Sequence, residues 1–199
     1  MDQVAPHHHG NLREALIIAG MGLLSEGGMA ALTLRRAAAR AGVSHAAPAH
    51  HFDGLPGLLT AIAARAFTKF ADMMQSARES AGTDPFQRLV GICQGYLDFA
   101  RAHHGLFHVM FVSPEVNRSD PALTPQSTRA YLLLRAACLP FAAPGATEDA
   151  LLETAVWSLV HGYATLGFDG TGGHRRAFAR SPVIAELLQE LLAGRQQTP

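Results

Sequence analysis

The sequence predicts an all-α protein. No segment alternates apolar and polar residues for long enough to form a strand, and apolar residues instead recur at intervals of three and four. Alanine is abundant and β-branched residues are sparse, which favours helix over strand. Of the 199 residues, 48% are hydrophobic and 16% are charged, so the chain can bury a core and does not have the composition of a disordered segment.

The apolar pattern divides the chain into about nine helices. Their expected ranges are 12–26, 33–41, 44–52, 56–80, 85–103, 105–112, 126–141, 147–168 and 182–193. Thr33, Ser44 and Thr147 are suited to cap the helices that they begin, and Gly27-Gly28 is suited to end the first. The proline-containing segment 113–125 is expected to be a mobile loop, and the glycine- and arginine-rich segment 169–181 is expected to be a second loop.

Composition excludes several classes of protein. Only Cys93 and Cys138 are present, which argues against a disulfide scaffold and fits a reducing compartment. No run reaches the roughly 18 apolar residues of a membrane span, and the N-terminus lacks the pattern of an export signal. We therefore expect a cytoplasmic protein without membrane association.

No motif indicates an enzyme. His104 and His108 have a zinc-like spacing, but Gly105 is expected to break the helix between them, so histidines at a helix junction are the preferred interpretation. The glycine-rich segment 170–173 lacks the Gly-Lys-Ser/Thr ending of a phosphate loop. We expect no catalytic activity, no metal site and no cofactor.

The most informative segment is 33–52, with the sequence TLRRAAARAGVSHAAPAHHF. Two short helices joined by a turn at Gly42 make a helix-turn-helix, and the small alanines let the two helices cross closely. The total charge of the chain is balanced, but this segment carries Arg35, Arg36 and Arg40 and no acid. The alternative interpretation is a pair of alanine-rich helices that only pack.

The second helix of this motif is expected to enter the major groove of DNA with its first residues. Ser44 can meet a phosphate, His45 can reach a base edge and Ala46 can touch a thymine methyl. Pro48 stands in the first turn, where a missing N–H costs little, although its ring can tighten that turn. The expected DNA-binding residues are Thr33, Arg36, Ser44, His45, Ala46, Pro48, His50 and His51.

The segment 33–52 and the leucine-rich stretch GLPGLLTAIAARAF that follows it resemble the TetR family of transcription regulators. Residues 157–162, WSLVHG, resemble the Trp-x-x-x-His-Gly signature of one branch of that family. The resemblance implies an all-helical homodimer with a DNA-binding domain over 1–53 and a ligand-binding and dimerisation domain over 54–199. It also implies that an effector shifts the fourth helix, so that the two DNA-binding heads no longer match successive major grooves.

The sequence departs from the family pattern at two phosphate contacts. Ala49 replaces a tyrosine that members commonly have, and Leu55 replaces a lysine. We therefore expect weaker and less salt-sensitive DNA binding than in a typical member, unless His50 and His51 gain charge and compensate.

Two further sets of residues are assigned to the C-terminal part. An apolar pocket with a few polar groups is expected among Phe67, Phe70, Met74, Cys93, Tyr96, Leu97, Phe107, Met110, Phe111, Leu134, Trp157 and His161. A dimer interface is expected at Ala155, Ser158, Gly162, Val183, Ile184, Leu187, Leu188 and Leu191. For both sets the alternative is ordinary packing within one chain.

The sequence thus predicts a homodimeric transcriptional repressor that binds a double-stranded DNA operator and is released by a small apolar or amphipathic effector. The alternative is a helical ligand-binding or interaction protein in which DNA binding is weakened.

Overall fold

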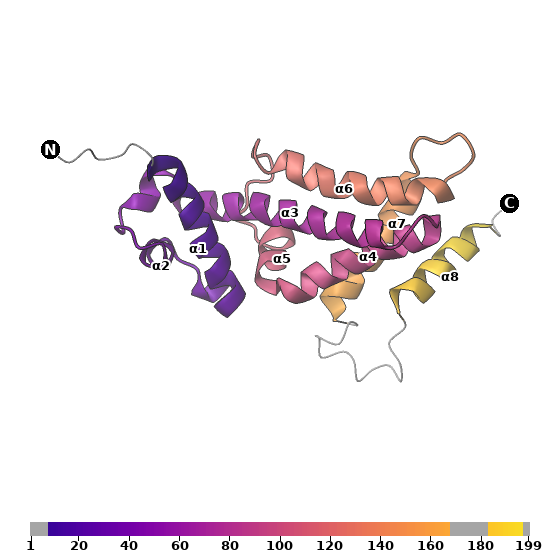
Figure 1. Ribbon diagram of the computed structural model, residues 1–199, viewed down its shortest axis with the longest axis horizontal. Coiled ribbons are helices and arrows are strands. Elements are labelled where there is room, and N and C mark those ends of the chain that lie inside the picture. Colours follow the sequence, from indigo (N-terminus) through magenta and orange to yellow (C-terminus); the bar gives the residue numbers. More distant parts are fainter. Residues whose placement is uncertain (1–7, 168–182, 197–199) are drawn as a thin grey trace. The chain divides into compact units, whose positions relative to one another are not determined.

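A computed structural model describes residues 8–167 and 183–196, so the expected loop 169–181 lies outside the described residues. Over the described part, all regular structure is helical, which confirms the all-α prediction (Figure 1). The elements are α1 His8–Ala31, α2 Leu34–Arg40, the 3-10 helix η1 Ala47–His50, α3 Gly54–Ser80, α4 Pro85–Ala102, α5 His104–Phe111, α6 Thr124–Cys138, the 3-10 helix η2 Leu139–Phe141, α7 Ala150–Leu166 and α8 Ile184–Gln196.

The chain forms two compact units, and neither is a continuous stretch of sequence. Unit 1 comprises residues 1–67 and 103–126, with α1, α2, η1, the first half of α3 and α5. Unit 2 comprises residues 68–102 and 127–199, with the second half of α3, α4, α7, α8 and all but the start of α6. The predicted boundary between residues 53 and 54 falls inside unit 1, at the start of α3, and the functional division at that point stays a prediction.

The core of unit 1 is built from α1, α3 and α5. Leu16 and Leu24 are buried on α1, and Leu59 is buried on α3. Helix α5 crosses α1 at Gly105, where a Cβ atom would lie 2.3 Å from the carbonyl oxygen of Leu24. Only glycine permits this approach of the two backbones.

Helix α1 is interrupted at Gly27 and Gly28, where the sequence predicts its end. Gly28 has φ 61° and ψ −158°, a backbone conformation that favours glycine, and a short helical turn follows as far as Ala31. By length and composition alone, the stretch Leu12–Ala31 could cross a membrane, with a mean hydropathy of 1.2. The stretch contains Arg13, Glu14 and Glu26, so it is not an unbroken run of about 18 apolar residues, and the expectation that no such run is present stands. A core helix meets the same test, and α1 packs against both α2 and α5.

The segment between α5 and α6 is held by specific hydrogen bonds rather than left open. Arg118 Nη1 donates to the carbonyl of Met110 at 2.7 Å, which satisfies a carbonyl in the last turn of α5. The backbone N–H of Asn117 donates to Thr60 Oγ1 at 3.0 Å, and Thr60 is buried on α3. The loop predicted over 113–125 is present, and it is attached to α3 and α5.

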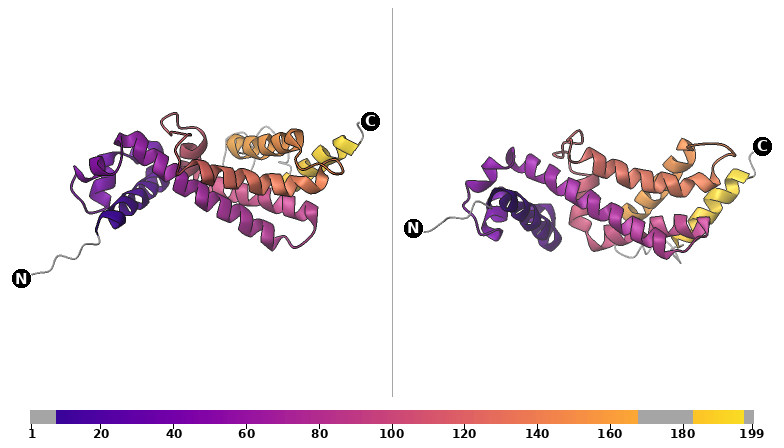
Figure 2. Two further views of the ribbon diagram at one scale, coloured as in Figure 1. Left: turned by 90° about the horizontal axis from the view of Figure 1, so that it is seen from above. Right: turned by 45° about the horizontal axis from the view of Figure 1, so that its top comes forward.

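Unit 2 packs the second half of α3 against α4, with α6 running alongside α3 (Figure 2). Gly91 and Gly95 lie on the face of α4 towards α3, and a Cβ on either would lie 2.7 Å from a backbone oxygen of Ala77 or Met73. On the other helix pair, Arg129 of α6 donates to Asp72 of α3 at 2.7 Å. Glycines thus set the α3–α4 distance, and a surface ion pair links α3 with α6.

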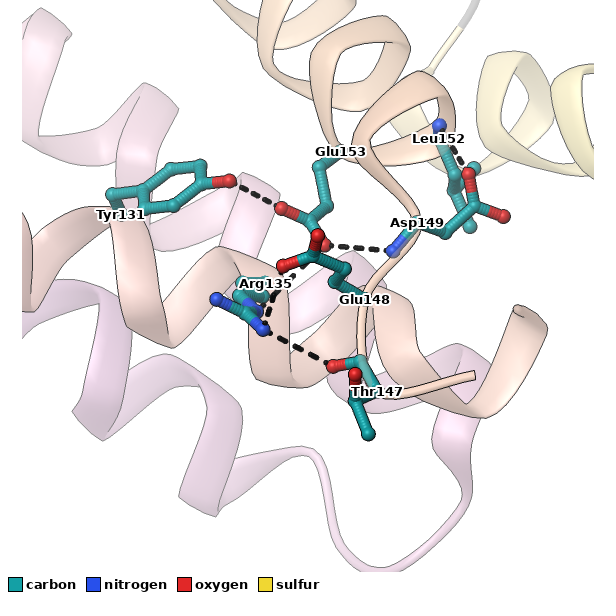
Figure 3. Close-up of polar contacts among 7 residues, drawn as sticks. All are labelled: Tyr131, Arg135, Thr147, Glu148, Asp149, Leu152 and Glu153. Carbon is teal, nitrogen blue, oxygen red and sulfur yellow. Dashed lines mark hydrogen bonds and ion pairs between the residues drawn. The ribbon is translucent and has the colours of Figure 1, made fainter. Parts of the chain in front are cut away.

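The start of α7 is fixed by a polar cluster around a buried carboxylate (Figure 3). Asp149, not the expected Thr147, is the N-cap, and its side chain accepts from the N–H of Leu152 at 2.9 Å. Glu153 is 3% exposed and accepts from the Asp149 N–H at 3.0 Å and from the hydroxyl of Tyr131.

Arg135 of α6 completes this cluster. Its guanidinium lies 3.9 Å from Glu153 Oε1 and 3.1 Å from Glu148, and it donates to the carbonyl of Thr147. The cluster therefore ties the first turn of α7 to α6.

Candidate DNA interface and sensor core

Helix α2 and the turn after it have the predicted geometry. Thr33 caps α2, and its side chain accepts from the N–H of Arg36 at 3.1 Å. Ala37 and Ala38 are fully buried, as close crossing requires. Gly42 has φ +70°, and the helix-turn-helix turn is thereby confirmed.

The second helix of the motif is shorter and tighter than predicted. Only η1, Ala47–His50, is helical, and it is a 3-10 helix whose N-cap is Ala46 without a side-chain cap. The predicted α-helix over 44–52 with Ser44 as its cap is therefore wrong. The physical reason is Pro48, which has no N–H to donate to the carbonyl of Ser44, so the N–H of Ala47 bonds to that carbonyl instead, at 3.1 Å. We call residues 44–52 the recognition segment.

Most of the predicted DNA-binding residues are at the surface. Ser44, His45, Ala46 and His50 are exposed, and His51 is half-buried. On α2, Thr33 and Arg36 are also exposed. Pro48 is buried, so its contribution is to the backbone of the recognition segment rather than to a contact surface.

One of the three arginines of the motif is neutralised by an acid that lies outside it. Arg40 donates from both terminal nitrogens to Glu26 of α1, at 2.6 and 2.7 Å. The hydrogen bonds from Arg40 hold the pKa of Glu26 below its ordinary value, and they raise the pKa of Arg40. Arg35 and Arg36 are both exposed, and the charge of Arg36 also contributes to the lowered pKa of Glu26.

Sequence reasoning missed a cation next to the recognition segment. Arg13 of α1 places its guanidinium carbon 5.3 Å from the centre of the Phe52 ring. Arg13 is exposed, whereas Phe52 is buried at the end of the recognition segment. The two residues are far apart in the sequence, and no local motif joins them.

In unit 2, aromatic side chains gather around Tyr96 of α4. Phe70 of α3 and Trp157 of α7 contact the Tyr96 ring edge to face, with centroids 4.8 and 5.8 Å away. The Tyr96 hydroxyl lies 2.6 Å from Nδ1 of His161, which also belongs to α7. These residues, all predicted for the pocket, are thus brought together.

The polar groups of this core are shifted towards their neutral forms. Burial raises the pKa of the Tyr96 hydroxyl and that of the Cys93 thiol. Burial also lowers the pKa of His161 from its ordinary value of 6.5. At neutral pH the Tyr96 hydroxyl and the His161 imidazole are therefore both uncharged, and the hydrogen bond between them joins two neutral groups.

The other predicted pocket residues divide between the two units. Phe111 contacts Phe67 and Phe107 in unit 1, with centroids 5.5 and 4.8 Å away, and Met110 is buried there. Buried in unit 2 are Met74, Cys93, Leu97 and Leu134. Sequence reasoning missed Phe99, which contacts Phe70 in unit 2. Whether either set holds a ligand stays a prediction.

The residues predicted for the dimer interface also differ in exposure. Ile184 and Leu188 are buried in the chain itself and contribute to the core of unit 2. Ala155, Gly162, Leu187 and Leu191 are partly exposed, and Ser158 and Val183 are exposed.

Two residues that the prediction omitted extend the exposed face of α7. Leu151 is 75% exposed and Leu166 is 46% exposed. At helical spacing they continue the stripe of Ala155, Ser158 and Gly162 in both directions.

This arrangement defines an all-helical transcriptional regulator, in which a helix-turn-helix is joined to a larger helical part. The family model described as the tetracyclin repressor-like C-terminal domain matches residues 89–192, more than half of the chain. The chain therefore belongs to the TetR family of ligand-responsive transcriptional regulators.

Solved structures agree with this assignment. A protein of unknown function from Rhodococcus sp. RHA1 is 26% identical over 96% of both chains, with a TM-score of 0.71. The TetR-family regulator PfmR from Thermus thermophilus is 22% identical over 90% of this chain and 94% of its own, with a TM-score of 0.57. LfrR from Mycobacterium smegmatis, solved with proflavine, is 18% identical over 92% and 95%, with a TM-score of 0.58. No curated protein matches the chain significantly.

Proposed function

We propose that this regulator is a cytoplasmic repressor that binds a DNA operator as a homodimer and is released by a small apolar or amphipathic molecule. The observation that carries the proposal is the exposure of Ser44, His45 and Ala46, directly after the turn at Gly42. These side chains stand on a hydrogen-bonded backbone, so they are presented to a partner in a fixed arrangement.

DNA recognition divides into two kinds of contact. The guanidinium of Arg36 and the hydroxyl of Thr33 are suited to phosphates, which position the protein and set the salt dependence of binding. The imidazole of His45 and the methyl of Ala46 are suited to base edges, which carry the sequence preference. Because Arg40 is bound to Glu26, we assign it to the stability of the motif and not to DNA.

The exposed face of α7 is the proposed centre of the dimer interface. Leu151 and Leu166 offer apolar surface at the two ends of this face, and Gly162 lets a second helix approach closely between them. Burying these exposed leucines against a second copy of the chain removes apolar surface from water, which favours a dimer. Val183, Leu187 and Leu191 of α8 extend the same proposal.

The effector is proposed to bind among the aromatic residues of unit 2. Phe70 and Trp157 offer flat apolar faces, and the Tyr96–His161 pair offers a hydrogen bond that can orient a ligand. The LfrR structure is described in complex with proflavine, which supports an effector of aromatic character here. The motif at 157–162 supports the proposal that the chain belongs to the Trp-x-x-x-His-Gly branch.

The deciding experiment is selection of duplexes from a random pool by the full-length protein, followed by titration of the selected duplex. We expect one palindromic sequence to be enriched, because a symmetric dimer reads two half-sites. His45→Ala should weaken binding to that duplex and relax its sequence preference by about 1–3 kcal/mol. His104→Ala, which removes a histidine from α5, should leave both unchanged.

Failure to enrich any sequence would favour the alternative, a helical ligand-binding or interaction protein. Ala49 and Leu55 are the observation behind that alternative, because neither can bind the phosphate that the family's tyrosine and lysine bind. Titration at several salt concentrations at pH 6 and pH 8 measures the deficit. A steep salt dependence that is the same at both pH values would contradict the expected weak contact with compensation by His50 and His51.

A further inference from the structure

Arg13 is a cation held in a fixed place at the end of the recognition segment. Its guanidinium lies over the ring of Phe52, with the guanidinium carbon 5.3 Å from the ring centre. A cation stacked on an aromatic face loses rotational freedom but keeps its charge and its N–H donors. Because Arg13 is exposed, those donors remain accessible.

The position of Arg13 is coupled to the backbone that carries the recognition residues. The N–H of Phe52 donates to the carbonyl of Pro48 at 2.9 Å, so the ring under Arg13 belongs to the same hydrogen-bonded segment as His50 and His51. The acid next to Arg13 does not neutralise it, because Glu14 is bound to Arg65 of α3 at 2.5 Å. Arg40, by contrast, is held by Glu26.

We propose that Arg13 contacts a DNA phosphate beside the recognition segment and supplies one contact in place of the two that Ala49 and Leu55 do not make. Phe52 lies between these two positions in the sequence, so Arg13 brings a cation from α1 beside the stretch that contains Ala49 and Leu55. The inference rests on the proposed DNA-binding function. Arg13 supplies affinity and orientation and no base preference, since a phosphodiester carries no sequence information. Phe52 is the positioning residue that holds it.

The test compares Arg13→Ala and Arg13→Lys with the wild-type protein on two probes, the duplex selected by the wild type and a duplex of unrelated sequence. The loss of one phosphate contact should lower the magnitude of the slope of log K against log salt by about 0.9. At about 0.1 M salt, Arg13→Ala should then weaken binding to both duplexes by about eightfold. Arg13→Lys keeps the charge but not the flat stacked group, so its affinity for DNA should lie between those of the wild type and Arg13→Ala.

The matched control is Arg101→Ala, which removes an arginine from a surface ion pair with Asp98 in unit 2. It should leave the affinity and the salt slope at the wild-type values. Phe52→Leu keeps Arg13 but removes its support, and it should weaken both duplexes while circular dichroism reports an intact helical fold.

The outcomes separate the two proposals. If the wild type binds DNA and Arg13→Ala has the same slope and affinity on both duplexes, the role of Arg13 is refuted and the proposed function stands. An equal loss of DNA affinity in Arg101→Ala also refutes the role of Arg13, because the loss would then follow from the lower net charge of the protein and not from a contact at this position. If the wild type binds neither duplex, the proposed function fails and the inference fails with it.

Discussion

The hydroxyl of Tyr96 on α4 and Nδ1 of His161 on α7 lie 2.6 Å apart, and this hydrogen bond joins the two helices inside the aromatic core of unit 2. Tyr96 has no exposed surface, so its hydroxyl is satisfied within the protein, by His161, and not by water. A buried hydroxyl without a partner costs about 1–3 kcal/mol, which makes the pair a determinant of how α7 sits on α4.

Removing the Tyr96 hydroxyl alone should cost less than removing its partner. Tyr96→Phe deletes both the hydroxyl and its need for a bond, and we expect a loss of about 1 kcal/mol in the free energy of unfolding. His161→Leu leaves the buried hydroxyl without its acceptor, and we expect a loss of about 1–3 kcal/mol. Urea unfolding of both variants and the double variant gives the coupling energy directly. A coupling of zero would mean that the hydrogen bond contributes nothing.

The same pair predicts how stability depends on pH. Burial lowers the pKa of His161 in the folded chain, whereas the unfolded chain titrates at the ordinary value of 6.5. Below pH 6.5 the unfolded state therefore binds the proton more readily, and stability falls as the pH drops towards the folded pKa. Unfolding at pH 8, pH 6.5 and pH 5 should show a difference between wild type and His161→Leu that shrinks with decreasing pH. A difference that is constant over this range would contradict the assignment.

The buried carboxylate of Glu153 predicts an asymmetry between two variants. Glu153→Gln removes the buried charge. Arg135, which is 32% exposed, keeps its contacts with Glu148 and with the Thr147 carbonyl. We therefore expect the free energy of unfolding to fall by about 1–2 kcal/mol. Arg135→Met leaves the carboxylate buried without a cation, and the loss should be larger, about 2–4 kcal/mol. Thermal and urea unfolding measure both. A larger loss in Glu153→Gln than in Arg135→Met would show that the hydrogen bonds from Tyr131 and the Asp149 N–H stabilise the Glu153 carboxylate without Arg135.

The crossing of α5 and α1 predicts intolerance of any side chain at position 105. Gly105→Ala would place a methyl 2.3 Å from the Leu24 oxygen, and since that atom belongs to the backbone, the helices must separate. We expect a loss of about 1–3 kcal/mol. Gly194→Ala in α8 is the matched control, because no atom of residues 8–167 or 183–196 lies within 4 Å of a Cβ at this position, and it should gain up to about 1 kcal/mol. Equal effects in urea unfolding would rule out the crossing as the cause.

Gly162 of α7 separates packing within one chain from packing between two. Nothing in the described part of the chain lies within 4 Å of a Cβ at this position, so Gly162→Leu should leave the folded subunit intact. If α7 forms the dimer centre, the leucine should shift the protein towards monomer in sedimentation measurements. Ser76→Leu, on the exposed surface of α3, is the control and should leave the oligomeric state unchanged. A dimer that survives Gly162→Leu places the interface elsewhere.

Local sequence signals predicted the all-helical fold, helix α2 and the turn that follows it. Thr33 as a cap, Gly42 as the turn and the buried pair Ala37 and Ala38 are each fixed by chemistry within a few residues. The tight turn at Pro48 was also visible in the sequence, but its full effect was not. The loss of one N–H converts the expected α-helix into a 3-10 helix because the neighbouring N–H takes the vacated carbonyl.

The features that sequence reasoning missed depend on contacts between distant residues. Arg40 counts towards the local positive charge of the motif until Glu26 is brought to it, and Arg13 carries no signal until Phe52 lies beneath it. Asp149 caps α7 in place of Thr147, and its neighbour Glu153 can be buried only because Arg135 and Tyr131 come from α6. Side-chain pairing across elements, unlike helical periodicity, has no fixed spacing in the sequence.

Helix α3 runs without interruption from Gly54 to Ser80 and contributes to both units, and residues 103–126 return to the first unit after α4. No single crossover in the gene can therefore exchange one unit for that of a relative. A chimera that joins the N-terminal part of this regulator to the C-terminal part of another would have to carry matching α1 and α5 surfaces from the same parent. A single crossover between α1 and α5 therefore preserves this crossing only when the second parent also has a glycine at the position of Gly105.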